Sequence, residues 1–213
     1  MSREANIHEY RIDCMAGEGN TLGTALRKYI IAGCVSWRPV GFKFNNSSAN
    51  SVIIADNILQ SCIKFRAAFS SLKFEIDDSI ADGDFCAVHY SFNTSLSSDD
   101  LSVGGVRCLT PGVPLLQATD DATISFIAYF RKGSGTYSES ENYVFLQEKL
   151  NTTDRLSFSV TSSAHYLTRN VTFDVETYDT KDVIIMKFSD TEMGAELIKE
   201  AAKIMIERLQ TLI

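Results

Sequence analysis

Three histidines are the first candidates for acid–base chemistry, because imidazole is the side chain that ordinarily titrates closest to neutrality. His8, His89 and His165 stand far apart and fall in different expected elements. Neither G-x-S-x-G nor H-E-x-x-H occurs, and no cysteine is flanked by an obvious base. We therefore expect each histidine to be a surface or packing residue, and we expect no catalytic residue.

Carboxylates and glycines offer two other kinds of site, for cations and for phosphate. Adjacent acids occur at Asp77-Asp78, Asp99-Asp100 and Asp120-Asp121, all in turn-like contexts typical of solvated loops or caps. The last pair precedes an expected strand and could bind a cation weakly. The glycine-rich run Lys132–Tyr137 matches neither G-x-G-x-x-G nor a P-loop, so we expect a turn at a strand end. No cofactor is expected.

The cysteines give no sign of a metal site or a disulfide framework. They are scattered, odd in number and contain no C-x-x-C pair. Their positions are Cys14, Cys34, Cys62, Cys86 and Cys108. We expect free and mostly buried thiols, with no metal bound.

Composition places the chain among folded soluble proteins. Its 213 residues allow one domain or two small ones, and 45% are hydrophobic and 22% charged. A net charge of −7 argues against broad contact with nucleic acid, which requires a basic face. No apolar run approaches the roughly 20 residues of a membrane span, and the polar N-terminus does not resemble a signal peptide. We expect an intracellular protein, cytoplasmic or nuclear, that reaches nucleic acid only through other proteins and has no membrane partner.

A first helix is predicted within Glu18–Ala32. Thr21 is the expected N-cap, with the helix beginning at Leu22. Arg27 and Lys28 point away from its apolar stripe. The stripe contains Leu22, Ala25, Leu26, Tyr29 and Ile30.

A terminal helix is predicted to run almost to Ile213. Ser189–Glu192 has capping-box spacing and precedes it. Its stripe is wide for a chain end, so it either packs on its own sheet or also crosses a partner. The stripe contains Leu197, Ile198, Ala201, Ile204, Met205, Leu209 and Leu212.

Strands with period-two alternation account for most of the remaining chain. A further helix is predicted over Ile53–Phe69, and the nearly all-apolar segment Val183–Phe188 should lie centrally in its sheet. The fold class is therefore α+β. The predicted strands are His8–Met15, Val40–Phe44, Leu72–Ile76, Phe85–Phe92, Val106–Leu109, Thr123–Arg131, Tyr143–Leu146, Leu156–Val160, Val171–Tyr178 and Val183–Phe188.

The segment Leu22–Lys28, LGTALRK, resembles the L-G-N-A-L-R-R signature of the first helix in alpha-like subunits of multisubunit DNA-directed RNA polymerases. That family includes the N-terminal domain of bacterial alpha, its archaeal counterpart and the third-largest subunit of eukaryotic RNA polymerase II. Asn170–Ile213 is similar to the closing segment of bacterial alpha, and Ile124–Tyr137 to the family's R-K/R-G-x-G-Y segment. Thr24 replaces the usual Asn, and Asp77–Thr119 is not matched to any segment of the family.

The resemblance implies a two-lobed architecture. A discontinuous dimerisation lobe, residues 1–36 and 165–213, would combine an antiparallel sheet with two helices. A β-rich insertion lobe, residues 37–164, would interrupt it. The family's cysteine cluster and the C-terminal DNA-contacting domain of bacterial alpha are missing, which fits a compact and divergent member, such as one from a virus, where it could be packaged in the virion.

The implied role is assembly of an RNA polymerase. The chain would be no enzyme alone but part of a nucleotidyltransferase complex, pairing with a second alpha-like subunit and docking two large catalytic subunits. Arg27 and Lys28 match basic residues near the large-subunit docking surface, and Leu26→Asp is expected to abolish pairing. The residues expected to contact the paired subunit are Leu22, Ala25, Leu26, Tyr29, Ile30, Ile198, Ala201, Met205, Leu209 and Leu212.

Several alternatives stay open at this point. The pair could be a homodimer or a heterodimer, and the chain could correspond to either protomer of it. The main competing class is a β-rich structural or ligand-binding protein without a role in transcription, with Leu72–Val160 as its functional part. An exposed apolar surface on a lobe built from both chain ends would favour the assembly subunit.

Overall fold

The computed structural model describes residues 7–45, 62–93, 95–117, 124–152, 158–168, 170–189, 191 and 193–211. Within these residues the protein contains four α-helices, and every paired strand is antiparallel. The predicted α+β class is therefore confirmed. Predictions for Ile53–Ser61, for the Asp120-Asp121 pair and for Leu212 lie outside the described residues.

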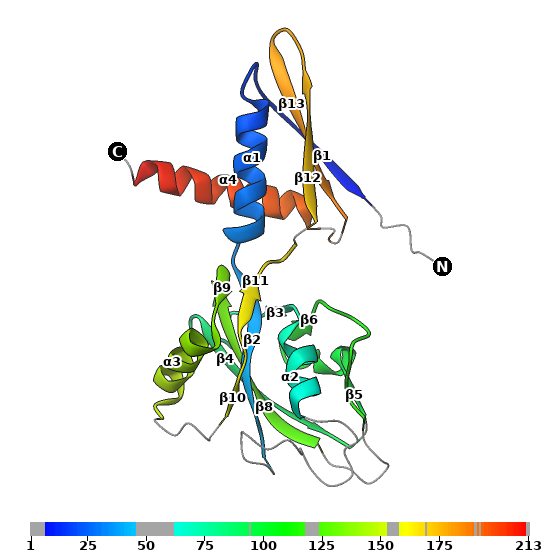
Figure 1. Ribbon diagram of the computed structural model, residues 1–213, viewed down its shortest axis with the longest axis vertical. Coiled ribbons are helices and arrows are strands. Elements are labelled where there is room, and N and C mark those ends of the chain that lie inside the picture. The colour runs from blue at the N-terminus through cyan, green and yellow to red at the C-terminus, as the bar shows by residue number, and fades with distance from the viewer. Residues whose placement is uncertain are drawn as a thin grey trace. The chain divides into compact units, whose positions relative to one another are not determined.

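The chain divides into two compact units (Figure 1). Unit 1 consists of Met1–Val35 and Tyr166–Ile213, and unit 2 of the continuous segment Ser36–His165. Both ends of the chain therefore contribute to unit 1. The sequence assigned residues 1–36 and 165–213 to a dimerisation lobe, and that assignment stays a prediction.

Unit 1 contains a three-stranded sheet in the order β1 (His8–Met15), β13 (Lys181–Phe188), β12 (Val171–Thr177). The middle strand is the apolar one, and Ile184 and Met186 on it are fully buried. Each strand was predicted, and the central place of β13 is confirmed. Ile184 and Met186 are buried because they project from the central strand into the core formed with the helices.

Opposite faces of this sheet differ in chemistry. One face packs against helices, and the other carries ion pairs across the strands. Lys187 Nζ lies 2.7 Å from Asp174 Oδ2, and Arg11 pairs with Glu176 across β13. The outer face of the sheet therefore carries ion pairs that flank Val183 and Ile185 of β13.

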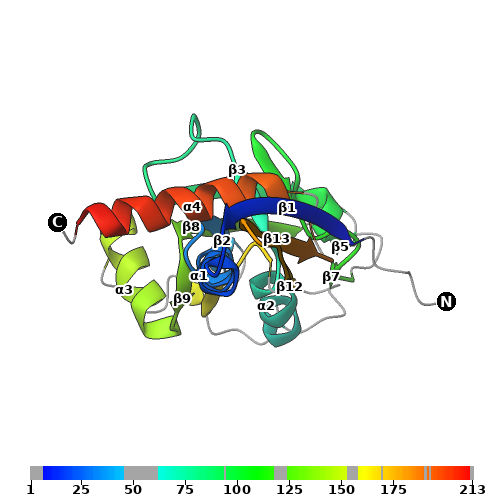
Figure 2. The same ribbon diagram turned by 90° about the horizontal axis from the view of Figure 1, so that it is seen from above.

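Two helices, α1 (Gly19–Ala32) and α4 (Gly194–Gln210), cover the other face. They cross at a steep angle, and the C-terminal half of α4 extends past α1 (Figures 1 and 2). Their buried stripes meet the inward side chains of the sheet in one core. The buried members are Leu26, Ile30, Cys34, Val171, Ile184, Met186, Phe188, Leu197 and Ala201.

The predicted start of α1 is wrong. The helix begins at Gly19, three residues before Leu22, and neither Thr21 nor the N-cap residue Glu18 supplies a side-chain cap. Asp182 of β13 caps it instead, because its Oδ2 accepts the backbone N–H groups of Gly17 at 3.0 Å and Gly19 at 2.9 Å. Asp182, which is distant in the sequence, therefore takes the capping role that was predicted for Thr21.

The predicted capping box of the terminal helix is also wrong. The N-cap of α4 is Met193, whose N–H is bound by the Thr191 hydroxyl at 3.1 Å. A Cβ on Gly194 would lie 2.3 Å from the ring of Tyr10. The helix therefore begins where a glycine permits close approach to β1.

Unit 2 is built around a six-stranded sheet in the order β4-β8-β2-β3-β6, with β10 also paired to β2. The central strand β2 begins at Ser36, earlier than the predicted Val40, and a shift in pairing between Pro39 and Gly41 accommodates the proline. Two small ribbons, β9-β11 and β5-β7, complete the unit. Its strands are β2 (Ser36–Phe44), β3 (Phe74–Ile76), β4 (Phe85–Phe92), β5 (Leu96–Ser97), β6 (Val106–Cys108), β7 (Pro114–Leu116), β8 (Ile124–Gly133), β9 (Gly135–Tyr137), β10 (Ser159–Val160) and β11 (Ser163–His165).

Aromatic side chains fill the core of unit 2. The helix α2 (Cys62–Ser70) places Phe65 and Phe69 against Phe42 of β2 and Phe126 of β8, with ring centroids 4.9–6.3 Å apart. This helix is the C-terminal part of the one predicted over Ile53–Phe69. A short 3₁₀ helix, Ser98–Leu101, buries Leu101 in the same core.

The predicted strand Tyr143–Leu146 is wrong. It lies inside the helix α3 (Glu139–Leu150), which begins with a reciprocal capping box between Ser138 and Glu141. Asn151 ends the helix in the left-handed conformation, with φ 47°. A four-residue apolar pattern cannot separate a strand from a buried helical turn, whereas the two caps could have identified the helix.

Candidate functional site

The core of unit 1 is incompletely covered. It contains nine buried residues and eleven partly buried hydrophobic residues packed against them, among those the structure describes. The largest core of unit 2 has twenty buried and only six partly buried members. A core with more partly exposed than buried members leaves apolar surface in contact with water, which is typical of interaction sites.

Most of the partly buried side chains come from β1, α1 and α4, and we call the set the rim. Tyr10 of the rim packs edge-on against Phe188, with ring centroids 5.6 Å apart. Tyr29 lies under the guanidinium of Arg208, which is 5.1 Å from its ring centroid. The rim consists of Tyr10, Ile12, Cys14, Leu22, Tyr29, Leu167, Phe173, Ile198, Ala202, Ile204 and Met205.

A second apolar row on α4 runs beside its buried stripe. Its members are separated by steps of three, four, three and four residues, the spacing of a helix-pairing seam. Leu209 on this row is 60% exposed, and the adjacent Ile206 is 56% exposed. The row consists of Ala195, Ile198, Ala202, Met205 and Leu209. The sequence predicted only part of it, although the spacing also includes Ala195 and Ala202.

The structure divides the residues predicted to contact a partner. Leu26, Ile30 and Ala201 are buried in the core of unit 1, at 7%, 0% and 0% exposure, and do not reach its surface. The others lie at the surface or partly exposed: Leu22, Ala25, Tyr29, Ile198, Met205 and Leu209. A charge at Leu26 would therefore disrupt the fold of unit 1 before it could report on pairing.

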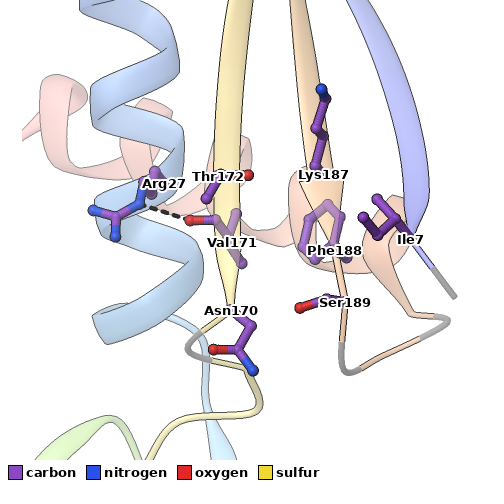
Figure 3. Close-up of a pocket in the computed structure, with 8 residues that line it drawn as sticks. All are labelled: Ile7, Arg27, Asn170, Val171, Thr172, Lys187, Phe188 and Ser189. Carbon is purple, nitrogen blue, oxygen red and sulfur yellow. Dashed lines mark hydrogen bonds between the residues drawn. The ribbon is translucent and has the colours of Figure 1, made fainter. Parts of the chain in front are cut away.

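Arg27 and Lys28 are exposed on α1, as their predicted position off the stripe requires. Arg27 is also an internal tie, since its Nε donates to the carbonyl of Val171 at 2.7 Å. Figure 3 shows this bond joining α1 to the first residue of β12. The terminal guanidinium nitrogens form no ion pair with any described residue, and a guanidinium is a group that binds carboxylates in a bidentate manner.

A pocket of about 320 Å³ lies at this end of the sheet, between Arg27 and the ends of β12 and β13 (Figure 3). Asn170 and Ser189 contribute polar groups, and Phe188 contributes an apolar surface. Lys187 reaches the pocket but is neutralised, because Asp174 lies 2.7 Å and Glu9 3.5 Å from its Nζ. Among the described lining residues, Arg27 is the basic one without an ion pair to a described acid.

The cysteines are free, as predicted, and three of the five are buried. Burial raises the pKa of the Cys34 thiol to about 11, with a smaller contribution from the Glu200 charge. Burial and the nearby Asp182 charge also raise the pKa of Cys14. Neither thiol is activated as a nucleophile at neutral pH.

The histidine His165 belongs to a buried hydrogen-bond chain in unit 2. Its Nδ1 donates to the Ser36 carbonyl at 2.8 Å, because a carbonyl can only accept. Its Nε2 therefore accepts from the Ser163 hydroxyl at 3.0 Å, and that hydroxyl accepts from the Asn142 amide. Asn142 in turn accepts from Arg131, whose guanidinium stacks 3.7 Å from the centroid of the Tyr137 ring.

The other two histidines lie on strands at the surface of their units. His89 Nε2 is 3.0 Å from the Ser125 hydroxyl, and the Asn45 amide contacts both. This Ser–His pair is exposed, and no described carboxylate orients the ring as a catalytic triad requires. Among the described residues no group of three or more His, Cys, Asp or Glu side chains could hold a metal ion.

The fold and this surface define an α+β protein in which unit 1 exposes part of its core. No protein-family model matches the sequence, and no curated protein matches it. In the part of the chain that the structure describes, none of the helices combines the length and apolarity needed to cross a bilayer.

Proposed function

We propose that the protein is a non-catalytic assembly subunit of a DNA-directed RNA polymerase, of the alpha-like kind. One observation carries the proposal, which is the incompletely covered core of unit 1. The segment LGTALRK that resembles the family's signature lies on α1, one of the two helices that form this core. A second alpha-like subunit would cover the rim and the second apolar row of α4.

The distribution of charge supports the same face as the partner site. The outer face of the unit 1 sheet is closed by ion pairs such as Lys187–Asp174 and Lys181–Asp13, and desolvating them would cost free energy. The helical side exposes Ile206 and Leu209 instead. Burial of apolar surface stabilises by about 25 cal/mol per Å² before the entropy of association is subtracted.

In this proposal the contacts predicted from the sequence are divided between two roles. Tyr29, Ile198, Met205 and Leu209 contact the partner, whereas Leu26 and the other buried residues hold the helices that carry them. Arg27, with Lys28 beside it, faces a large catalytic subunit. Nucleic acid is reached only through the complex, as the net charge of −7 favours.

The first test is purification of the tagged chain from its native source under gentle conditions. We expect two very large subunits and one further alpha-like chain, or a second copy, in fixed mass ratio. A chain that stays monomeric and alone at moderate salt would refute the proposal and direct attention to unit 2. Sedimentation velocity of the recombinant chain distinguishes a homodimer from a heterodimer.

Surface variants then locate the interface. Ile206→Asp and Leu209→Asp each place a charge on an exposed side chain of α4, so the fold should survive while partner binding falls by about tenfold or more. Val144→Asp is the matched control, because Val144 is 52% exposed on α3 in unit 2. Equal losses in all three variants would contradict the assignment.

A further inference from the structure

Asp182 is a buried carboxylate whose hydrogen-bond partners come from distant parts of the chain. It is the second residue of β13 and only 3% exposed. Its Oδ2 accepts from the N–H groups of Gly17 at 3.0 Å and Gly19 at 2.9 Å, at the start of α1. Glu18, the N-cap residue, has helical dihedrals and makes no side-chain cap bond. Asp182 therefore supplies the cap that the helix lacks locally.

The contact requires glycine at positions 17 and 19, for two different reasons. Gly17 has φ +88°, which other residues rarely adopt. A Cβ on Gly19 would lie 2.9 Å from Oδ2 of Asp182 and 2.5 Å from Cγ1 of Val175, so a larger residue would displace the carboxylate. The loop, the helix start and the carboxylate form one fitted contact.

Several elements of unit 1 converge on Asp182. Its backbone carbonyl accepts from the Cys14 thiol of β1 at 3.6 Å. Its Oδ1 is buried without a hydrogen-bond partner among the described residues. A buried carboxylate with one unpaired oxygen costs free energy, so we assign Asp182 a positioning role and not a gain in net stability.

We infer that Asp182 is the positioning residue of the partner surface, because it fixes the first turn of α1 against β13 and thereby sets where the rim residue Leu22 lies. The consequence for pairing rests on the function proposed above. The capping contact itself does not, and it can be measured in the chain alone.

The experiment compares full-length Asp182→Ala and Asp182→Asn with the parent chain. Asp13→Ala is the matched control, because it removes an exposed acid that belongs to the same strand pair. Hydrogen exchange followed by mass spectrometry reports the first turn of α1, with β8 of unit 2 as the internal reference. Partner retention, or sedimentation of a self-paired chain, reports the surface.

In Asp182→Ala the first-turn amides should exchange about tenfold faster than in the parent chain, as expected for the loss of an N-cap. Partner affinity should fall by at least about fivefold, since the first turn of α1, which carries the rim residue Leu22, is no longer held in place before binding. Asp182→Asn keeps an acceptor in place and should stay within about threefold of the parent in both measurements. Asp13→Ala should match the parent.

Unchanged exchange in Asp182→Ala would overturn the inference, and so would faster exchange with unchanged pairing. Should Asp182→Ala fail to fold, Asp182→Asn decides alone, because a loss of pairing as large as that from Ile206→Asp would contradict a capping role. If the parent chain pairs with nothing, the proposed function fails, while faster first-turn exchange would still support the positioning of α1.

Discussion

Acid should destabilise unit 2 through one residue, His165. Burial lowers the pKa of this histidine from 6.5 to about 4, with smaller contributions from the Arg38 and Arg131 charges, and against the opposing effect of its hydrogen bond to Ser36. In the unfolded chain the imidazole regains its ordinary pKa. As pH falls below 6.5, the unfolded state therefore takes up a proton that the folded state refuses.

The sign and size of the effect follow directly. Well above pH 6.5 the titration of His165 does not change the free energy of unfolding, and this free energy decreases progressively as the pH falls toward 4. The fall in pKa from 6.5 to about 4 corresponds to a maximum loss of about 3–4 kcal/mol, because a tenfold change in proton affinity is worth about 1.4 kcal/mol. Between about pH 7 and about pH 4.5 the histidine should remove about 2 kcal/mol.

Urea unfolding followed by tryptophan fluorescence measures this loss. The chain has a single tryptophan, and Trp37 is buried in unit 2, so its emission reports the unit that contains His165. His165→Asn should be less stable at neutral pH, because it lacks the bond to Ser163, but it should have the shallower pH dependence. Subtracting the pH dependence of one chain from that of the other cancels the contribution of the carboxylates that titrate in both.

Parallel pH profiles for the parent and His165→Asn would refute this reasoning. An imidazole resonance of His165 that titrates near 6.5 in the folded chain would refute it as well. Either result would mean that water reaches the ring more readily than its complete burial indicates.

Two further predictions concern local packing and capping. Gly194→Ala should destabilise unit 1 by about 1–3 kcal/mol, because the new Cβ would lie 2.3 Å from the ring of Tyr10 and 2.8 Å from that of Phe188. This loss should appear as faster hydrogen exchange in β13 with no change in β8. Equal exchange of β13 in Gly194→Ala and in the parent chain would contradict the prediction. Ser138→Ala should cost about 1 kcal/mol of unit 2 stability in urea, because it removes the acceptor of the Glu141 N–H. The backbone N–H and the hydroxyl of Ser138 both lower the pKa of Glu141, and because the variant keeps the N–H, this pKa should rise only part of the way toward its ordinary value; an unchanged carboxyl titration by NMR would argue against the hydroxyl's share of the capping box.

The elements with clear periodicity could be predicted from the sequence. The strands β1 and β4 have the predicted bounds, His8–Met15 and Phe85–Phe92, and β13 is central as its apolar run required. In each case the order of apolar and polar side chains along the segment determines which of them are buried.

What could not be predicted depended on residues distant in the chain. The cap of α1 comes from Asp182, so no local pattern around Thr21 could reveal it. The start of α4 depends on the space that Tyr10 leaves beside Gly194. Of the candidate site, the apolar stripes were predictable, but not which of their residues face inward, since that depends on how α1 and α4 cross.

The insertion of unit 2 within unit 1 sets an order of events during synthesis. β1 and α1 leave the ribosome before unit 2, but their sheet partners β12 and β13 follow only after the whole of Ser36–His165. Unit 2, whose pairings lie within one continuous segment, can fold while unit 1 is still incomplete. Until the last helix emerges, the nascent chain carries the unpaired apolar face of α1, and this is the stage at which a chaperone would be most needed and premature association most damaging.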